Sequence, residues 1–319
     1  MASCRAWRTL AFALCFAGIL LADTSTMNNQ SPLIPASPKR LYADVKALTA
    51  IDPPRNYLNV GSLNRAAAHI RDEFERLGCD LTVQPFTVNG KEYKNILCSF
   101  EGGGEERIIV GAHYDVYGPY PGADDNASGV AGLLEIGRLL NELRPPLKKR
   151  VDLVAYSLEE PPFFRTRKMG SYVHAKSLAS ANATVKVMIC LESIGYFSEE
   201  PDSQHFPFFA FRWFFPDKGN FIVVVGKWGQ GRPVKEVRDL MSQASGIHVD
   251  SINAPSLLPG IDLSDHKNYW KFGYDAVMVT DSAFYRNPHY HMPTDTIGTL
   301  NFDCMAEVVK GVYWAVVNL

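Results

Sequence analysis

The sequence predicts an α/β fold: a single domain with a mixed, mostly parallel central sheet and helices on both faces. Two observations support this prediction. Short apolar runs of strand length alternate with segments whose apolar residues recur at helical spacing, and such alternation is typical of a largely parallel sheet covered by helices. A hairpin signal before these runs indicates that antiparallel strands extend the sheet.

The first predicted elements are a helix and a hairpin. From Ser62, which can serve as N-cap, apolar residues recur at helical spacing until Gly78 ends the pattern. Residues 80–86 and 93–100 then flank the turn Asn89-Gly90, the dipeptide that favours a tight hairpin turn.

The remaining elements alternate along the chain. Strands are expected at 107–112, 151–157, 185–191, 221–226 and 276–281. Helices are expected at about 126–143, 170–178, 234–245 and 300–318. We find no internal repeat and no clear linker, so residues 41–319 are expected to form one domain. A Pro/Ser/Asn-rich lead-in arm, residues 25–40, precedes it.

The N-terminus predicts a removable leader. Arg5 and Arg8 precede an apolar stretch at 10–22, and small and polar residues follow, so residues 1–24 have the pattern of a secretory signal peptide. The stretch is shorter than the roughly 20 residues that span a bilayer. We therefore expect a secreted or periplasmic protein without a stable membrane span after cleavage.

Composition narrows the class of protein. The 319 residues include 32 basic and 34 acidic side chains, for a net charge of −2. With 46% hydrophobic residues, the chain is neither disordered nor collagen-like. It has no basic excess to bind a phosphate backbone, so nucleic acid is not an expected partner. Nothing in the sequence indicates an oligomeric state.

Four cysteines remain outside the leader: Cys79, Cys98, Cys190 and Cys304. None forms a CxxC pair, which argues against a cysteine-based zinc site. If the predicted hairpin forms, Cys79 and Cys98 lie near each other at one end of it. In an oxidising compartment they can be bridged, and two half-buried thiols are the alternative.

Metal-type residues follow three successive predicted strands. The strand at 107–112 leads into His113, that at 151–157 into Glu159-Glu160, and that at 185–191 into Glu192. The carboxyl ends of parallel strands meet at one edge of a sheet, where ligands bind. Imidazole and carboxylates are ligands that suit a divalent metal.

The strongest block is His113-Tyr114-Asp115 followed by Gly122-Ala123-Asp124-Asp125-Asn126-Ala127-Ser128-Gly129. A helix cap explains one acidic residue, but not two preceded by a histidine. At a helix N-terminus, Asp125 would be held ionised by the helix dipole, as a carboxylate bridging two cations requires. Asp115 is placed to accept the other imidazole N–H of His113. A further histidine, His291, follows near the C-terminus.

The blocks HYD, GADDNASG, SLEE, LESIGY and YHMPTDT, in this order over 113–296, resemble the co-catalytic di-zinc metallopeptidase family. Its members include secreted bacterial leucine aminopeptidases, glutamate carboxypeptidase II and glutaminyl cyclases. The resemblance covers roughly residues 40–319.

The resemblance implies two Zn²⁺ per chain. In the family pattern, His113 binds one ion, His291 binds the other, and Asp125 bridges both. Glu160 and Glu192 each complete the ligand set of one ion. It also implies that Glu159 is the general base and that Tyr290 donates to the oxyanion. Asp265-His266 matches a stretch of the family without an assignable role. Glu192 departs from the family pattern, because the best-known aminopeptidases have Asp there.

Two further segments could shape the substrate site. Seven aromatic residues between 206 and 215 either pack over a core or line a pocket. Arg165, Arg167 and Lys168 form a basic patch that could receive a substrate carboxylate if it faces the pocket, or could be a solvated loop.

These observations predict an exported zinc aminopeptidase acting on a peptide with a free N-terminus, whose α-ammonium the acidic site would attract. Glu159 would take the proton of the attacking water and return it to the leaving amine. The alternatives are a peptidase of the same family releasing a C-terminal acidic residue, a glutaminyl cyclase-like acyltransferase, and an inactive binding or receptor domain on this fold.

Overall fold

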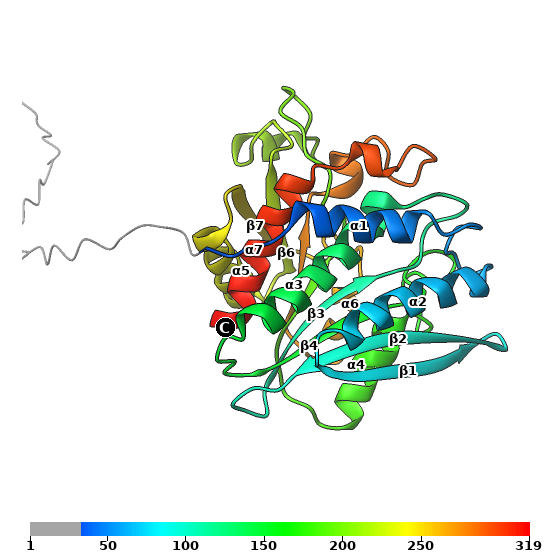
Figure 1. The fold of residues 1–319 in the computed structure, drawn as a ribbon. Helices are drawn as coiled ribbons and strands as arrows, with labels where there is room; N and C mark the ends of the chain where they lie inside the picture. The colour runs from blue at the N-terminus through cyan, green and yellow to red at the C-terminus, as the bar shows by residue number, and fades with distance from the viewer. Residues whose placement is uncertain (1–32) are drawn as a thin grey trace, which may run out of the picture. The chain divides into compact units, whose positions relative to one another are not determined.

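A computed structural model describes residues 33–319 of the chain. The predicted signal peptide, residues 1–24, lies outside the described residues, as does the first half of the predicted arm, residues 25–32. The described part contains an eight-stranded sheet with the order β1-β2-β4-β3-β5-β8-β6-β7 (Figure 1). The predicted single-domain α/β fold with a mixed sheet is confirmed.

The strands are β1 Asp80–Val88, β2 Lys91–Phe100, β3 Arg107–His113, β4 Arg150–Tyr156, β5 Val185–Leu191, β6 Phe221–Lys227, β7 His248–Ala254 and β8 Ala276–Thr280. The four central strands β4, β3, β5 and β8 are parallel to one another. The hairpin β1–β2 joins β4 in antiparallel register, and at the other side β6 is antiparallel to β8 and parallel to β7.

The helices are α1 Pro38–Thr49, α2 Val60–Glu75, α3 Gly129–Leu143, α4 Gly170–Ser180, α5 Gly231–Ala244, α6 His266–Trp270 and α7 Phe302–Asn318. Helices α1, α3 and α7 pack against one another over one face of the sheet (Figure 1). The core of that face also receives α2 and α5, whereas α4 and α6 contribute to the core of the opposite face.

Successive side chains of the central strands enter the two cores in turn. In β3, Ile108 and Val110 belong to the core under α1, α2, α3, α5 and α7, and Ile109 belongs to the core under α4 and α6. In β5, Val187 belongs to the first of these cores and Met188 to the second. This alternation follows from the two-residue period of a strand, and it explains why these strands are apolar throughout.

Three elements were not expected from the sequence. Helix α1 begins at Pro38, within the predicted lead-in arm, and Ser37 caps it by accepting a hydrogen bond from the Arg40 amide. Its start is hidden because Pro and Ser also mark loops, although Pro is favourable in a first helical turn. Edge strand β7 is mostly polar and has only two buried residues, Val249 and Ala254, without regular alternation. Helix α6 has only five residues, too few for a periodic pattern.

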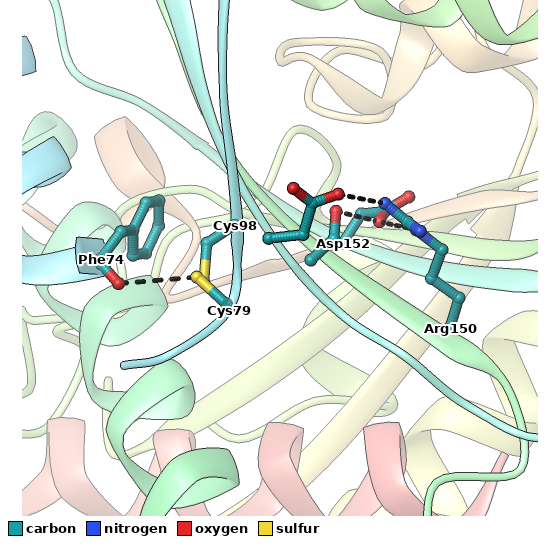
Figure 2. Close-up of a disulfide and its surroundings, with 7 residues drawn as sticks. Phe74, Cys79, Cys98, Arg150 and Asp152 are labelled. Carbon is teal, nitrogen blue, oxygen red and sulfur yellow. Dashed lines mark hydrogen bonds and ion pairs between the residues drawn. A yellow bond between two sulfur atoms is a disulfide. The ribbon is translucent and has the colours of Figure 1, made fainter. Parts of the chain in front are cut away.

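The hairpin contains a disulfide, which was one of the two alternatives that the sequence allowed for Cys79 and Cys98. Cys79, just before β1, is bonded to Cys98 in β2, with their Cα atoms 5.5 Å apart. Figure 2 shows the bridge close to Phe74 near the end of α2, with the ion pair of Arg150 and Asp152 on the neighbouring strand β4. The bridge therefore fastens the start of the hairpin beside α2.

Within residues 33–319, no helix has both the length and the apolar character needed to cross a membrane.

Candidate metal centre and active site

The candidate site lies where the parallel strands end. His113 is the last residue of β3, Glu159 and Glu160 follow β4, and Glu192 directly follows β5. Two loops complete the site. Asp125 lies in the turn η1 (Ala123–Ser128) before α3, and His291 lies in the long connection after β8. The structure thus brings together all five residues proposed as metal ligands.

The five side chains form two clusters that share one carboxylate. In the first, which we call the inner cluster, His113 Nε2 lies 3.3 Å from Asp125 Oδ1 and 3.3 Å from Glu192 Oε2. In the second, the outer cluster, His291 Nε2 lies 3.0 Å from Asp125 Oδ2 and 3.5 Å from Glu160 Oε1. Each oxygen of Asp125 faces a different cluster, which is the arrangement of a bridging carboxylate.

Unpartnered polar atoms show that these clusters fit cations. His113 Nε2, Asp125 Oδ1, Glu160 Oε1 and His291 Nε2 are buried and accept or donate no hydrogen bond. Buried polar atoms are almost always paired, because an unpaired one costs free energy. Imidazole nitrogens and carboxylate oxygens converging in this way suit zinc, so the residues present can hold such ions.

The buried carboxylates do not share one electrostatic environment. Burial disfavours the ionised form of Asp125, but its contacts with His113 and His291 outweigh that penalty and hold its pKa below the ordinary value. Burial, with the negative charge of Asp125 nearby, raises the pKa of Glu160 to about 8. Helix α3 begins at Gly129, after the turn that carries Asp125, and the contacts with the two histidines lower the pKa of Asp125.

Asp115 faces the Nδ1 side of the His113 ring, as predicted, but its nearest atom there is the backbone oxygen. The Nδ1 atom of His113 lies 3.2 Å from the backbone oxygen of Asp115 and 3.6 Å from its Oδ1. The carboxylate instead accepts hydrogen bonds from the amides of Glu159, at 3.0 Å, and Glu160, at 3.1 Å. Asp115 therefore positions the turn that carries both glutamates.

A second carboxylate that the sequence analysis did not single out works in the same way. Asp295, in the quoted YHMPTDT block, accepts hydrogen bonds from the amides of Asp124, at 2.9 Å, and Asp125, at 3.2 Å. Asp124 in turn accepts one from Gly195 N. Buried acids thus hold the backbone of the loops that carry the ligands. The position of Asp295 after His291 was visible in the motif, but the amides that it binds were not.

Glu159 and Tyr290 flank the clusters. Glu159 is buried, its Oε2 lies 4.0 Å from His113 Nε2, and burial raises its pKa well above the ordinary value. Tyr290 stacks on the ring of His291 at 4.0 Å between centroids. Burial and the nearby carboxylates raise the pKa of its phenol well above the ordinary value, so the hydroxyl remains a donor.

Asp265 and His266 are both fully buried, at the start of α6. The preceding residue, Ser264, donates a 2.6 Å hydrogen bond to Oε2 of Glu192. Neither carboxylate oxygen of Asp265 has a hydrogen-bond partner. The stretch therefore lies against the inner cluster, where sequence patterns alone gave it no role.

An apolar pocket adjoins the clusters, with Glu192 and Tyr290 in its lining. The predicted aromatic segment divides between two environments. Phe206, Phe211 and Phe215 line the pocket, whereas its other rings are exposed: Phe208, Phe209, Trp213 and Phe214. No lysine or arginine of the described chain lines this pocket.

The basic patch lies elsewhere. Arg165 donates to Asp262 at 2.6 Å, and Lys168 donates to Asn89 at the hairpin turn. Arg167 lines a separate hollow along α4. None of the three lines the apolar pocket, so the structure places this patch as a surface feature.

The fold and the paired donor clusters define a metallopeptidase-like chain, and sequence comparison agrees. The chain belongs to peptidase family M28, whose profile matches residues 95–315. The resemblance given by the motifs is therefore confirmed.

The chain is also similar to individual proteins of known sequence. It is 46% identical over 291 residues to the uncharacterized protein YfbL of Escherichia coli K12, covering 89% of this chain and 88% of that protein. It is 24% identical over 232 residues to leucine aminopeptidase 1 of Fusarium vanettenii, covering 67% of this chain. The matched region spans 52% of the fungal protein, about half of its length.

Solved structures share the fold. The zinc aminopeptidase BSAP from Bacillus subtilis aligns with a TM-score of 0.70 at 16% identity, covering 89% of this chain and 95% of that one. The glutaminyl cyclase of Bacteroides thetaiotaomicron aligns with a TM-score of 0.67 at 18% identity, covering 91% of this chain and 100% of that one. At these identities the likeness concerns the fold alone.

Proposed function

We propose that this protein is an exported zinc aminopeptidase that holds two zinc ions per chain and removes the N-terminal residue of peptides. The observation that carries the proposal is the pair of donor clusters joined by Asp125, with the buried Glu159 beside them and an apolar pocket adjoining them. Family membership and the aminopeptidases among the relatives support it.

The two clusters supply the ligands. His113 and Glu192 would hold one zinc ion, Glu160 and His291 the other, and Asp125 both. When bound, the two ions would polarise the scissile carbonyl and lower the pKa of the attacking water.

Glu159 is placed to transfer the proton. A general base must lie within reach of the reacting water and have a pKa near the working pH. Glu159 faces the inner cluster, and burial raises its pKa. Its backbone amide is fixed by Asp115. It would accept the proton of the water and deliver it to the leaving amine.

Tyr290 is placed to donate a hydrogen bond to the oxygen that gains charge as the carbonyl is attacked. Its phenol stays protonated because burial and the neighbouring carboxylates oppose its ionisation, and its stacking on His291 fixes the ring. Tyr290 also lines the apolar pocket, so it lies between the clusters and the bound side chain.

The pocket indicates the substrate. Its walls are apolar and aromatic, and its end next to the metal centre is acidic through Glu192. An N-terminal residue with a large apolar side chain would fill it and bring its α-ammonium near the carboxylates. A C-terminal acidic residue would need a cation to pair with its carboxylates, and no lysine or arginine of the described chain lines the pocket. This favours the aminopeptidase over the carboxypeptidase alternative.

The ligand set disfavours both a glutaminyl cyclase and an inactive receptor domain. The family resemblance implies a single zinc ion for a glutaminyl cyclase, whereas here all five donor positions hold competent ligands around Asp125. An inactive receptor domain would not need to retain Glu159 buried beside these ligands.

Export is supported by two features of the chain. The N-terminal sequence has the pattern of a secretory signal peptide. The Cys79–Cys98 bridge agrees with it, because disulfides persist mainly in oxidising compartments.

A substrate panel tests the proposal. The protein loaded with Zn²⁺ should release Leu and Phe from peptides with a free N-terminus faster than Asp or Gly, and should not act on the N-acetylated peptides. Release of a C-terminal Glu from a blocked peptide would instead establish the carboxypeptidase alternative. Conversion of an N-terminal Gln to pyroglutamate would establish the cyclase.

A further inference from the structure

Arg55 is a buried cation under the candidate site. It lies between α1 and α2 and is only 2% exposed. Among the described residues, no carboxylate forms an ion pair with it. Its guanidinium instead donates to four backbone carbonyl oxygens: Tyr114 at 2.9 Å, Leu48 at 3.3 Å, Pro121 at 2.6 Å and Gly122 at 2.6 Å.

Three of these acceptors lie at the two ends of the connection between β3 and η1, residues 114–122. Tyr114 lies between His113, a proposed ligand, and Asp115, which holds the glutamate turn. Gly122, which follows Pro121, lies three residues before Asp125, the carboxylate shared by both clusters. The Arg55 side chain therefore joins the two ends of this connection. The backbone oxygen of Arg55 also accepts a hydrogen bond from Val116 N.

The chemistry of this contact requires arginine. Four carbonyls around one planar group match the forked donors of a guanidinium, whereas the ammonium of lysine has three donors in a compact head and cannot span the same set. A charge buried without a partner acid is costly. The free-energy cost of burying Arg55 therefore indicates that this side chain has a role in fixing the backbone segments that it contacts.

Charge adds to geometry. Burial lowers the pKa of Arg55 to about 10, while attraction to Asp295, Asp115, Asp125 and Glu160 opposes that effect. The guanidinium therefore remains charged at neutral pH and offsets part of the repulsion among these acids.

We propose that Arg55 is a positioning residue that sets the spacing between the end of β3, which carries His113, and the turn η1, which carries Asp125, and so prepares the inner cluster for its cation. The inference rests on the proposed function in taking these clusters as metal sites. It assigns no direct contact between Arg55 and metal or substrate, and so it differs from the roles of the ligands and of Glu159.

The test compares Arg55→Lys and Arg55→Ala with the wild-type protein. Zn²⁺ and Co²⁺ affinities are measured by competition with a chromophoric chelator, and the visible spectrum of the Co²⁺ form reports the ligand geometry. Loss of a residue that supports metal ligands typically costs about 10- to 100-fold in metal affinity. We expect that loss for Arg55→Lys, with an altered Co²⁺ spectrum, and a larger one for Arg55→Ala.

Arg138→Lys is the matched control. Arg138 is also largely buried, in α3, but it donates to Asp44 of α1 and Glu73 of α2 and makes no hydrogen bond to the connection between β3 and η1. Its replacement should lower the melting temperature of the metal-free protein and leave metal affinity and the Co²⁺ spectrum unchanged. If Arg55→Ala does not fold, the lysine variant still decides the test.

The outcomes separate the two proposals. If wild-type protein binds no Zn²⁺ or Co²⁺, the proposed function fails. If wild-type protein binds both ions and Arg55→Lys binds them with the same affinities and spectrum while melting at a lower temperature, Arg55 is only part of the scaffold and the inference is overturned.

Discussion

The inner and outer clusters use the same ligand types in different surroundings. The side chain of His113 is 1% exposed, at the end of a central strand, whereas that of His291 is 25% exposed, in a loop. A small hollow that includes Tyr117 and Met292 opens next to Asp125 and His291. The inner cluster thus takes its histidine from the sheet, whereas the outer cluster takes its histidine from a partly exposed loop, where the ring stacks on Tyr117 and Tyr290. We expect a less exchangeable ion in the inner cluster.

The largest effect is expected from the residue that the clusters share. Asp125→Ala removes one ligand from each cluster, so the protein should lose both zinc ions and its peptidase activity. Elemental analysis after gel filtration in metal-free buffer measures the loss. Retention of one firmly bound ion would show that Asp125 does not bridge.

The next effect separates proton transfer from metal binding. Glu159→Gln keeps the shape of the side chain but removes the base, and kcat should fall by about 10²- to 10⁴-fold while two ions remain bound. Steady-state kinetics and metal analysis of the same sample check both statements. Unchanged turnover would mean that Glu159 is not the base.

Single histidine variants test the contrast between the clusters directly. His291→Ala should keep one ion per chain, bound in the inner cluster, because His113, Asp125 and Glu192 are untouched. His113→Ala should lose the inner ion and also destabilise the metal-free fold, because His113 is fully buried. Metal analysis and thermal melting distinguish the two variants. If both variants lost the same number of metal ions, the two clusters would bind their ions only together.

A smaller effect is expected where the outer histidine is stacked. The ring of Tyr117 lies parallel to that of His291, with 4.1 Å between centroids. Tyr117→Ala should weaken the more exchangeable ion several-fold and leave the other unchanged, as chelator competition can measure. Tyr120→Ala is the control, since this ring packs against that of Tyr117. Equal weakening in both variants would contradict a specific role for the stacked ring.

The smallest expected effect is on the pH dependence of folding stability, and it comes from two histidines outside the clusters. Its size must be known before the two clusters are compared at different pH values. Burial lowers the pKa of His174 to about 4 and that of His266 to about 4, so both are neutral in the fold. The unfolded chain binds their protons below about pH 6.5, and stability should therefore fall as the pH decreases from about 6.5 toward 4. Thermal melting of His174→Gln should show a shallower decline, and an identical decline would contradict the assignment.

Residues that follow strands were the ones that sequence reasoning placed best. His113, Glu160 and Glu192 could be brought to one edge because parallel strands end together, and the β5 bounds agree with the predicted range. Asp125 and His291 depended on the motifs of the family, since loop paths follow no period.

What sequence reasoning could not supply is the support beneath the ligands. Arg55 binds backbone carbonyls, and a carbonyl oxygen is present at every residue, so no motif marks its acceptors. The same reason hid the amides that Asp115 and Asp295 hold. Helix α1 was missed because its first residues resemble a loop.

The spread of the donors along the chain has a consequence for biogenesis. His113 ends the third strand, while His291 comes after the last one, β8. The three donors of the inner cluster are all present once synthesis has passed Glu192, whereas the outer cluster lacks a donor until His291 has been added. The inner cluster can therefore assemble from an incomplete chain, but the pair of clusters is complete only after the last strand of the sheet has been made.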